Sequence, residues 1–384
     1  MYNKMEHADL PMLLLALSLC GAGLLLAASM EYIGAAQELT SGSTDGLLKR
    51  QAAAVAAGLI FREALILFGS RRAVKAAPFI FAGGALLTAL TFSPLGVSPA
   101  GSDDRAWLEL GGTTIQPSEI LKLCFIISFA AHLDRCGEKL NSPGALGLLL
   151  LHSAFPAALC WAQGDQGTAL IFIIVASWML VSAGISMKWR LAAAVMIPAA
   201  GWAAWRFLLA EHHKQRLALI AQPSLDPLGA GFQQLCSRRA IAGGGWLGSG
   251  LFSRQRDLVY VSQAQNDMIF SYAAQTGGFL LCAVIIILLF AAVLRAVTVS
   301  HRSLGAGALM SSGTAALIFS HAFLNIAMTL GLAPVIGVPL PFVSSGGTAA
   351  ACMLGATAFV RAENRKESYE DNDHTRPEPQ GLDL

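Results

Sequence analysis

The stretch MIFSYAAQTGGFLLCAVIIILLFAAVL, Met268–Leu294, contains no charged residue along its whole length. A helix needs about 20 consecutive apolar residues to cross the hydrocarbon core of a bilayer. Two further runs are long enough for this, PMLLLALSLCGAGLLLAASM (Pro11–Met30) and GTALIFIIVASWMLVSAGI (Gly167–Ile185). The sequence therefore predicts a protein that crosses a membrane several times.

The composition of the whole chain supports this prediction. Of its 384 residues, 55% are hydrophobic and only 13% are charged, whereas a soluble domain carries about 25% charged residues. The net charge is +2 and the basic residues are scattered over short loops, so a nucleic acid is not an expected partner. The seven cysteines show no CxxC or other ligand spacing, so we expect neither a metal site nor a disulfide framework.

Apolar runs separated by loop signals predict an all-α polytopic membrane protein with about ten transmembrane helices. The first run is too long for a signal-peptide core, so it is interpreted as a retained helix. A long extracytoplasmic loop separates the seventh helix from the eighth. The expected spans cover residues 11–30, 51–69, 77–94, 117–134, 144–162, 167–186, 189–209, 268–295, 304–330 and 344–361.

The distribution of Lys and Arg predicts the orientation. With the amino terminus inside, slightly more than half of these residues fall on inner segments, so both termini are expected in the cytoplasm. Residues 1–362 then form a single transmembrane domain. Residues 363–384 are polar, acidic and contain proline, so they are expected to be a disordered cytoplasmic tail. The segments richest in Gly, Pro and ionisable residues fall on the outer face, where we expect the function to reside.

The first outer segment, GSDDRAWLELGGTTIQPSEILKL (Gly101–Leu123), leads into the fourth span. Glu119 and Lys122 are three positions apart, so they share one helix face and can pair. A capped helix with a stabilising pair is one interpretation. A functional site is the other, because a lysine one turn inside a membrane helix must face protein or water. Arg105 and Trp107 suit membrane anchoring and the binding of an anionic ligand equally well.

Two further outer segments carry charged residues. Asp165 lies in the short hairpin QGDQGTAL (Gln163–Leu170), where a turn between two helices is sufficient to explain it. The long loop carries arginines whose planar guanidinium groups suit phosphate binding, although contact with lipid headgroups explains them as well. These arginines are Arg216, Arg238 and Arg239.

The long loop also contains a helix-like piece and two glycine runs. Gln233–Ile241 alternates apolar and basic positions as an amphipathic helix does. The runs Gly243–Gly245 and Gly248–Gly250 supply flexible backbone that can approach a ligand closely.

Asp267 ends the long loop, directly before the apolar run of the eighth span. As a helix N-cap it would contribute roughly 1 kcal/mol, and as an acid or base it would take part in chemistry. Its position alone leaves both interpretations open. The segment GLAPVIGVPLPFVSSGGTA (Gly331–Ala349) contains three prolines, and irregular apolar backbone at membrane depth must be buried in protein or line a cavity.

Together these segments resemble the SEDS family of cell-wall polymerases, which includes RodA, FtsW and SpoVE. The matching motifs occur in the family's order, and only the first hundred residues and the tail lack a distinctive motif. The motifs lie at Trp107–Leu123, Gln163–Ala169, Gln215-Arg216 with Asp226–Gly231, Ala240–Leu251 and Gly331–Gly347.

The resemblance implies a peptidoglycan glycosyltransferase that polymerises lipid II, an undecaprenyl-pyrophosphate-linked disaccharide-pentapeptide. It would act at the outer face of the bacterial cytoplasmic membrane, in elongation, division or sporulation, beside a class B penicillin-binding protein. Asp267 takes the place of the family's essential aspartate, which implies a general base. The resemblance assigns substrate contacts or cavity electrostatics to Arg105, Trp107, Glu119, Lys122, Asp165, Arg216, Arg238 and Ser344.

The sequence departs from the family around this aspartate. Ser262-Gln263 replaces Pro-Glu, Gln275-Thr276 replaces an acidic pair, and Ser345 replaces a tyrosine. A divalent cation such as Mg²⁺ stays open as a cofactor, with no protein ligand assigned to it. Two other functions also stay open, a lipid II flippase and a non-catalytic scaffold for a transpeptidase. Charges gathered at the outer face favour chemistry there over passage through the membrane.

Overall fold

The computed structural model describes residues 9–37, 46–98, 104–111, 113–203, 206–207, 214, 218–220, 222–223, 226, 229–253 and 258–361. Each of the ten expected spans coincides with a helix, so the all-α polytopic prediction is confirmed. The expected tail, residues 363–384, lies outside the described residues. The ten helices are α1 (Leu10–Gln37), α2 (Leu47–Phe68), α4 (Ala77–Ala89), α5 (Pro117–Cys136), α6 (Pro143–Ala162), α7 (Gln166–Ser182), α8 (Met187–Ala203), α11 (Ile269–Arg302), α12 (Gly305–Thr329) and α13 (Gly347–Ala356).

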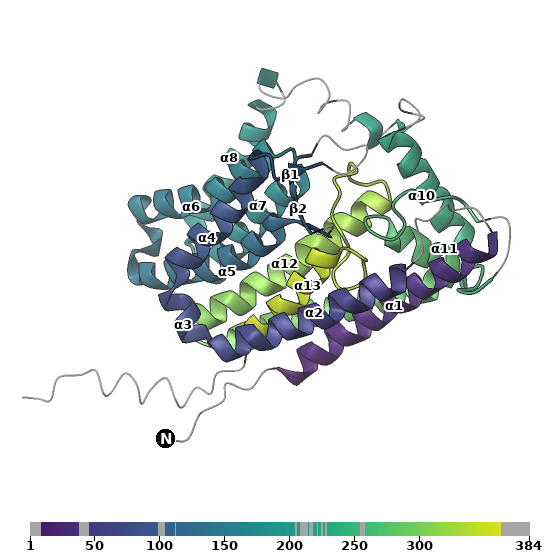
Figure 1. The fold of residues 1–384 in the computed structure, drawn as a ribbon. Helices are drawn as coiled ribbons and strands as arrows, with labels where there is room; N and C mark the ends of the chain where they lie inside the picture. Colours follow the sequence, from purple (N-terminus) through teal and green to yellow (C-terminus); the bar gives the residue numbers. More distant parts are fainter. Residues whose placement is uncertain are drawn as a thin grey trace, which may run out of the picture.

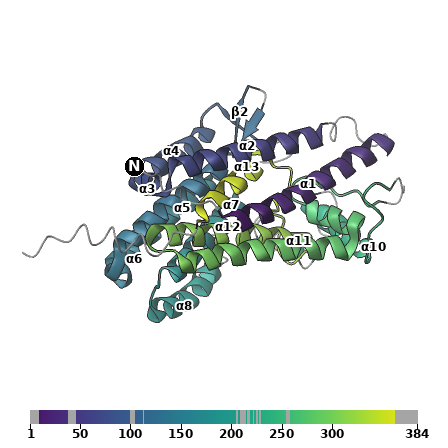
Figure 2. The ribbon, with the colours of Figure 1, turned by 90° about the horizontal axis from the view of Figure 1, so that it is seen from below.

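The helices differ in how far they reach across a bilayer. By length and composition, α1, α2, α6, α11 and α12 are long and apolar enough to cross a membrane, and α4, α7 and α13 are apolar but shorter. Helix α5 is buried along most of its length and packs against α4 and α12, while α12 packs against α11 and α7. The helix axes lie roughly along a common line, and α12 and α13 are in the middle of the bundle (Figures 1 and 2).

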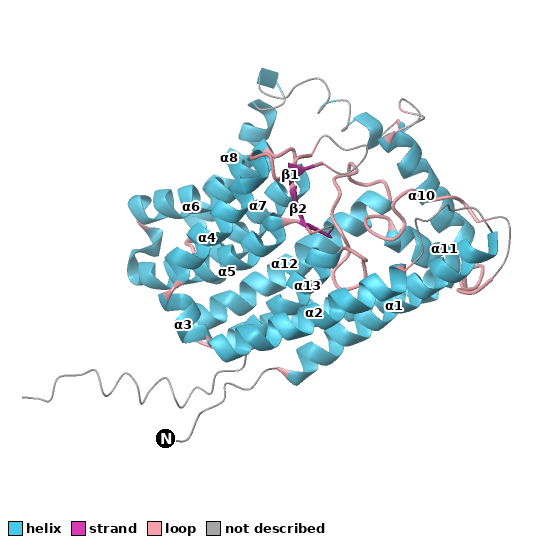
Figure 3. Ribbon diagram, viewed as in Figure 1, coloured by secondary structure: helices cyan, strands magenta, loops and turns pink. Residues whose placement is uncertain are grey.

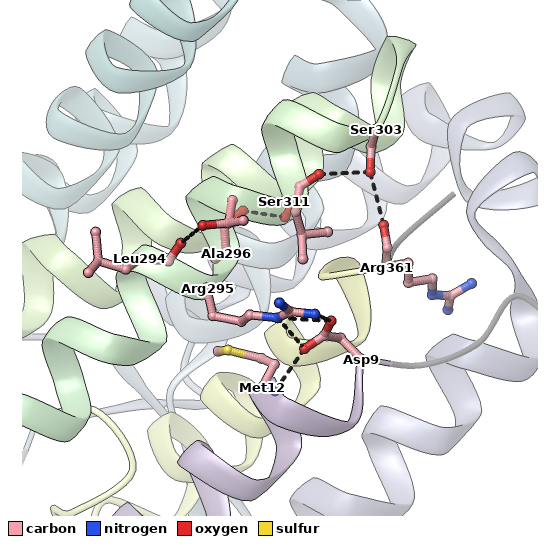
Figure 4. A network of polar contacts seen from close by, with 10 residues as sticks. Asp9, Met12, Leu294, Arg295, Ala296, Ser303, Ser311 and Arg361 are labelled. Carbon is pink, nitrogen blue, oxygen red and sulfur yellow. Dashed lines mark hydrogen bonds and ion pairs between the residues drawn. The ribbon is translucent and has the colours of Figure 1, made fainter. Parts of the chain in front are cut away.

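Both ends of the described chain lie at the same end of the bundle. The Arg295 side chain on α11 donates to both carboxylate oxygens of Asp9, with Nη2 2.5 Å from Oδ2, and Asp9 also accepts from the Met12 amide at the start of α1. Nearby, the Ser303 hydroxyl after α11 donates to the Arg361 carbonyl at 3.0 Å (Figure 4). An even number of spans places the two chain ends on the same side in this way.

A small antiparallel sheet lies between α4 and α5, where the sequence predicts only an irregular loop. Its strands are β1 (Gly96–Val97), β2 (Trp107–Leu110) and β3 (Thr113–Ile115), paired in that order (Figure 3). Leu108 on β2 pairs with Ile115 and is buried, whereas Glu109 is exposed. From Ala106 to Glu109, buried residues alternate with half-buried or exposed ones, which is the signal of a half-buried strand. The adjacent Gly111 has φ +58°, a left-handed conformation that glycine adopts without strain.

The long loop contains the predicted amphipathic helix, α10 (Ala230–Gly244), which packs against α11. The glycine runs approach α11 rather than an open cavity. A Cβ at Gly248 would collide with the backbone of Thr276, and the amides of Ser249 and Gly250 donate to the carbonyls of Gln275 and Thr276 at 2.9 and 3.0 Å. Helix α11 is broken at Gly278, whose φ is +67°, so its carbonyls are available to the loop.

Candidate functional site

The candidate site lies where the amino-terminal ends of four helices, α5, α7, α11 and α13, come together. Gln116 precedes α5, and its side chain donates to Asp165 Oδ2 before α7 at 3.0 Å. The Gln116 amide donates to Thr348 Oγ1 in the first turn of α13 at 3.3 Å. The Ser345 amide, just before α13, donates to the Gln265 carbonyl just before α11 at 2.9 Å. Helix amino termini carry partial positive charge, so their convergence favours an anionic group in this region.

The segment that joins α12 to α13, residues 331–346, forms one wall of the site, and we call it the proline loop. Asn325 on α12 is fully buried and donates both amide hydrogens, to the Val338 carbonyl at 2.7 Å and to the Asp267 carbonyl at 2.8 Å. His321 lies one turn earlier on the same face of α12, with Nδ1 3.2 Å from the Pro339 carbonyl. Two polar side chains of one helix therefore hold the proline loop, and one of them also holds the backbone of Asp267.

Three buried polar groups behind the proline loop form a chain of hydrogen bonds. Lys122 Nζ lies 2.8 Å from Glu119 Oε1, which confirms the predicted pair, and 2.8 Å from His321 Nε2. An ammonium group only donates, so His321 Nε2 must be the acceptor. The proton of the neutral imidazole is then on Nδ1, where it is donated to the Pro339 carbonyl. The Glu119–Lys122 pair thereby fixes the ring that positions the proline loop.

Asp267 lies in the turn before α11 but does not cap this helix. The N-cap residue is Met268, and no side chain accepts a capping hydrogen bond there, so the helix-cap interpretation is wrong. Among the described residues, no donor is bonded to the Asp267 carboxylate. The side chain is half-buried and borders the exposed Gly337, where a Cβ would lie 3.7 Å from Asp267 Oδ2. A carboxylate held by its backbone with its oxygens unpaired is available to a substrate.

The surroundings of Asp267 favour its protonated form. Burial raises its pKa from 3.8 to about 6, and the negative charge of Asp165 contributes in the same direction. Asp165 caps α7, since its Oδ1 accepts from the Thr168 amide at 2.9 Å, so its interpretation as a residue of the helix–helix turn is confirmed. A carboxylate with a pKa near neutrality is a stronger base than an ordinary aspartate and is still ionised at pH 7.

Comparison with known proteins identifies the fold and the lineage. A profile of the cell cycle proteins FtsW, RodA and SpoVE matches residues 10–369. The chain belongs to this family.

The relatives with curated names include the following two. The peptidoglycan glycosyltransferase MrdB of Escherichia coli K12 is 30% identical over 343 residues, covering 88% of this chain and 90% of MrdB. The FtsW of Alkalilimnicola ehrlichii, named a probable peptidoglycan glycosyltransferase, is 32% identical over 349 residues, covering 89% and 86%.

Solved structures of similar proteins have the same fold. A chain of a peptidoglycan synthase complex that coordinates polymerization and crosslinking has a TM-score of 0.76 at 23% identity, covering 92% of this chain and 96% of that one. The rod shape determining protein RodA of Thermus thermophilus has a TM-score of 0.66 at 22% identity, covering 92% and 95%.

The other residues that the sequence analysis assigned to the candidate site lie at different positions around it. The Ser344 hydroxyl accepts from the Leu340 amide at 2.8 Å and donates to the Asn266 carbonyl at 2.7 Å, so it joins the proline loop to the turn that carries Asp267. Arg105 is exposed, and its amide donates to the Gln163 carbonyl at 2.9 Å, two residues before Asp165. Trp107 lies half-buried on the adjacent strand β2.

Among the described residues, no arginine of the long loop is bonded to Asp267. Arg238 on α10 donates through Nη2 to the Gly331 carbonyl at 2.7 Å and to the Ile220 carbonyl at 3.2 Å, so it ties α10 to the end of α12. Arg239 is exposed on α10. Arg216 lies outside the described residues.

Sequence reasoning missed three residues of the candidate site: Gln116, His321 and Asn325. A signal for two of them was present, because His321 and Asn325 are polar residues four positions apart in an otherwise apolar span. Polar side chains inside a membrane helix face the protein interior and mark functional positions. Gln116 had a signal of another kind, because it lies within the Trp107–Leu123 motif that carries the family resemblance.

Two of the carboxylates that this chain lacks relative to its family would lie away from the turn of Asp267. Gln275 and Thr276 lie eight and nine residues after Asp267, about 12 Å along the helix at 1.5 Å per residue. Both are buried, their backbone carbonyls accept from amides of the glycine-rich loop, and the Thr276 hydroxyl donates to the Tyr272 carbonyl at 2.8 Å. Within the described residues, no three His, Cys, Asp or Glu side chains gather as a metal site requires. The described side chains therefore offer no set of three protein ligands for a divalent cation.

Proposed function

We propose that this protein is a peptidoglycan glycosyltransferase that polymerises lipid II at the outer face of the bacterial cytoplasmic membrane. Residues 1–362 act as one multi-pass membrane domain with both termini in the cytoplasm, beside a class B penicillin-binding protein. The observation that carries the proposal is the half-buried carboxylate of Asp267, which has no bonded donor among the described residues and lies at the convergence of four helix amino termini. Membership of a family whose curated relatives bear this activity in their names supports it.

In this mechanism Asp267 acts as the general base. Its carboxylate accepts the proton of the acceptor sugar hydroxyl while that oxygen forms a bond to the anomeric carbon of the donor. The bond from this carbon to the pyrophosphate oxygen breaks, and undecaprenyl pyrophosphate leaves with the electron pair. The amino-terminal ends of α5, α7 and α13 place partial positive charge where the leaving group becomes more negative. Arg105 is exposed, its amide is bonded to the Gln163 carbonyl close to the start of α7, and its side chain contacts the pyrophosphate.

Glu119, Lys122, His321, Asn325 and Ser344 position the reacting group and do not touch the substrate. Glu119, Lys122 and His321 hold the proline loop through their chain of hydrogen bonds. Asn325 donates to the Asp267 carbonyl, and Ser344 donates to the Asn266 carbonyl. A general base has to be held near its target to within a fraction of an ångström, because small displacements reduce the rate steeply.

The proposal is tested by lipid II polymerisation with the purified full-length protein, in the presence and absence of its penicillin-binding partner. We expect the wild type to form glycan strands and Asp267→Asn to form none while it folds normally. Glu109→Gln is the matched control, because it removes one exposed carboxylate of the adjacent sheet and should leave the activity unchanged. Normal strand synthesis by Asp267→Asn would rule out this base. A wild type that binds its partner but makes no glycan would favour the scaffold function, and transport of lipid II without polymerisation would favour the flippase.

A further inference from the structure

The side chain of Gln275 on α11 is buried and faces the last part of the long loop, residues 258–262, which we call the return segment. In the amide orientation that satisfies both partners, its nitrogen donates to the Val259 carbonyl at 3.2 Å and its oxygen accepts from the Val259 amide at 2.5 Å. A side-chain amide carries a donor and an acceptor, so it can pair with both backbone groups of one residue. Gln275 therefore clamps the return segment to α11.

The backbone of Gln275 holds another part of the long loop. Its carbonyl accepts from the Ser249 amide at 2.9 Å and from the Ser249 hydroxyl at 3.1 Å. The residues between these two parts, 254–257, lie outside the described residues. One residue of α11 thus fixes the long loop on both sides of that stretch.

The return segment packs against the turn that follows it. Val261 is buried in a small cluster with Ala240 on α10 and with Met268, the residue directly after Asp267. Val335 of the proline loop packs against the same cluster. The return segment therefore meets the turn of Asp267, α10 and the proline loop at one place, so its position determines where that turn lies.

A strained residue joins the return segment to this turn. Gln263 has φ +56°, a left-handed conformation that is unfavourable for a residue with a side chain. Its carbonyl accepts from the Asn266 amide at 3.0 Å and from the Met268 amide at 3.2 Å, which closes the turn. Gln233 on α10 donates to the carbonyl of Ser262, directly before the strained residue, at 3.3 Å. Such a conformation persists only where the surrounding structure holds the chain.

We propose that Gln275 is a positioning residue for the transferase reaction. It clamps the return segment to α11, which holds the turn of Asp267 in place, and it does not touch the substrate. This inference rests on the proposed function. A carboxylate at the same position would accept from the Val259 amide, but it could not donate to the Val259 carbonyl and its charge would be buried. The amide that stands here in place of an acidic residue is therefore a working part of the site.

The test is steady-state polymerisation of lipid II by full-length Gln275→Glu and Gln275→Met beside the wild type. Both variants have nearly the shape of glutamine, and neither has its amide donor. We expect kcat to fall about tenfold or more at unchanged KM, because a displaced base slows the reaction without weakening substrate binding. Ser311→Ala is the matched control. It removes another buried hydrogen bond, to the Ala296 carbonyl at 2.9 Å near the opposite end of α11, and should keep the wild-type kcat.

Hydrogen–deuterium exchange on the same proteins shows whether the clamp exists. In the wild type the Val259 amide should be protected from exchange. Exchange over residues 258–268 should accelerate in both Gln275 variants and stay unchanged in Ser311→Ala. An unprotected Val259 amide in the wild type would overturn the inference, and this result requires no variant to fold.

The activities of the two variants provide further outcomes that would overturn it. Wild-type kcat in Gln275→Met would show that the clamp does not position the base. Activity of Gln275→Glu at or above the wild-type level would show that a carboxylate serves better at this position. Either result leaves the proposed function standing, provided that the wild type polymerises and Asp267→Asn does not. A wild type that makes no glycan would overturn both proposals.

Discussion

Replacing Asp267 by asparagine should abolish activity and, at the same time, stabilise the folded protein at neutral and alkaline pH. The pKa of this carboxyl is raised from 3.8 to about 6, first by burial and then by the charge of Asp165. Because the folded-state pKa lies above the unfolded one, the ionised carboxylate destabilises the fold above about pH 6. The effect is absent below about pH 4, where both states bind the proton.

The size of this effect follows from the pKa shift. A shift of about 2 units at about 1.4 kcal/mol per unit gives about 3 kcal/mol. This is an upper limit, since the side chain is half-buried and solvent reduces the penalty. Asparagine has nearly the same shape and carries no charge, so Asp267→Asn should gain up to this amount at pH 8 and nothing at pH 4.

The measurement is equilibrium unfolding of wild type and Asp267→Asn in mixed micelles between pH 4 and pH 8, beside a polymerisation assay. Glu109→Gln serves as the control and should show no pH-dependent difference, because Glu109 is exposed. A loss of stability in Asp267→Asn at pH 8 would contradict our account of the site. It would mean that the carboxylate is a structural hydrogen-bond acceptor, which is the role of a cap and not of a base.

Three further predictions follow from the same geometry. Asp165→Asn keeps the α7 cap but removes its charge, so the midpoint of the pH–rate profile should fall below about 6. The midpoint should stay above 3.8, because Asp267 remains buried. An unmoved midpoint would show that the two carboxylates do not interact. Lys122→Met leaves Glu119 buried and unpaired, so unfolding experiments should find a loss of about 3–5 kcal/mol, most of which Glu119→Gln in the same chain should restore. Gly167→Ala places a Cβ against a carbonyl of the proline loop, so it should lower kcat more than it raises KM in steady-state assays; wild-type kcat would show that the loop moves freely.

The missing family carboxylates bear on how this member works. Gln275 and Thr276 are buried in the contact between α11 and the glycine-rich loop, and they do not border the Asp267 carboxylate. Asp165 is the acidic neighbour that acts on the pKa of Asp267. The proposed base therefore retains the neighbour that tunes its pKa, although its sequence context has changed.

Several features could be predicted from the sequence because they depend on local patterns. The ten spans follow from the length of apolar runs, and each coincides with a helix. The Glu119–Lys122 pair follows from a spacing of three residues on one helix. The turn at Asp165 follows from a short polar segment between two apolar runs. In each of these cases, the residues that interact are neighbours along the chain.

Only the tertiary structure excluded the helix-cap interpretation of Asp267. A local pattern predicts a cap as readily as a base, and the choice depends on contacts with residues far away in the sequence. Asn325 holds its backbone from 58 positions away, and Ser344 holds the preceding residue from 78 positions away. His321 receives its hydrogen bond from Lys122 across 199 positions. Apolar periodicity encodes where a helix runs, whereas the packing of helices against one another determines which polar atoms meet. Within the described part of the chain, that packing brings no donor to the Asp267 carboxylate.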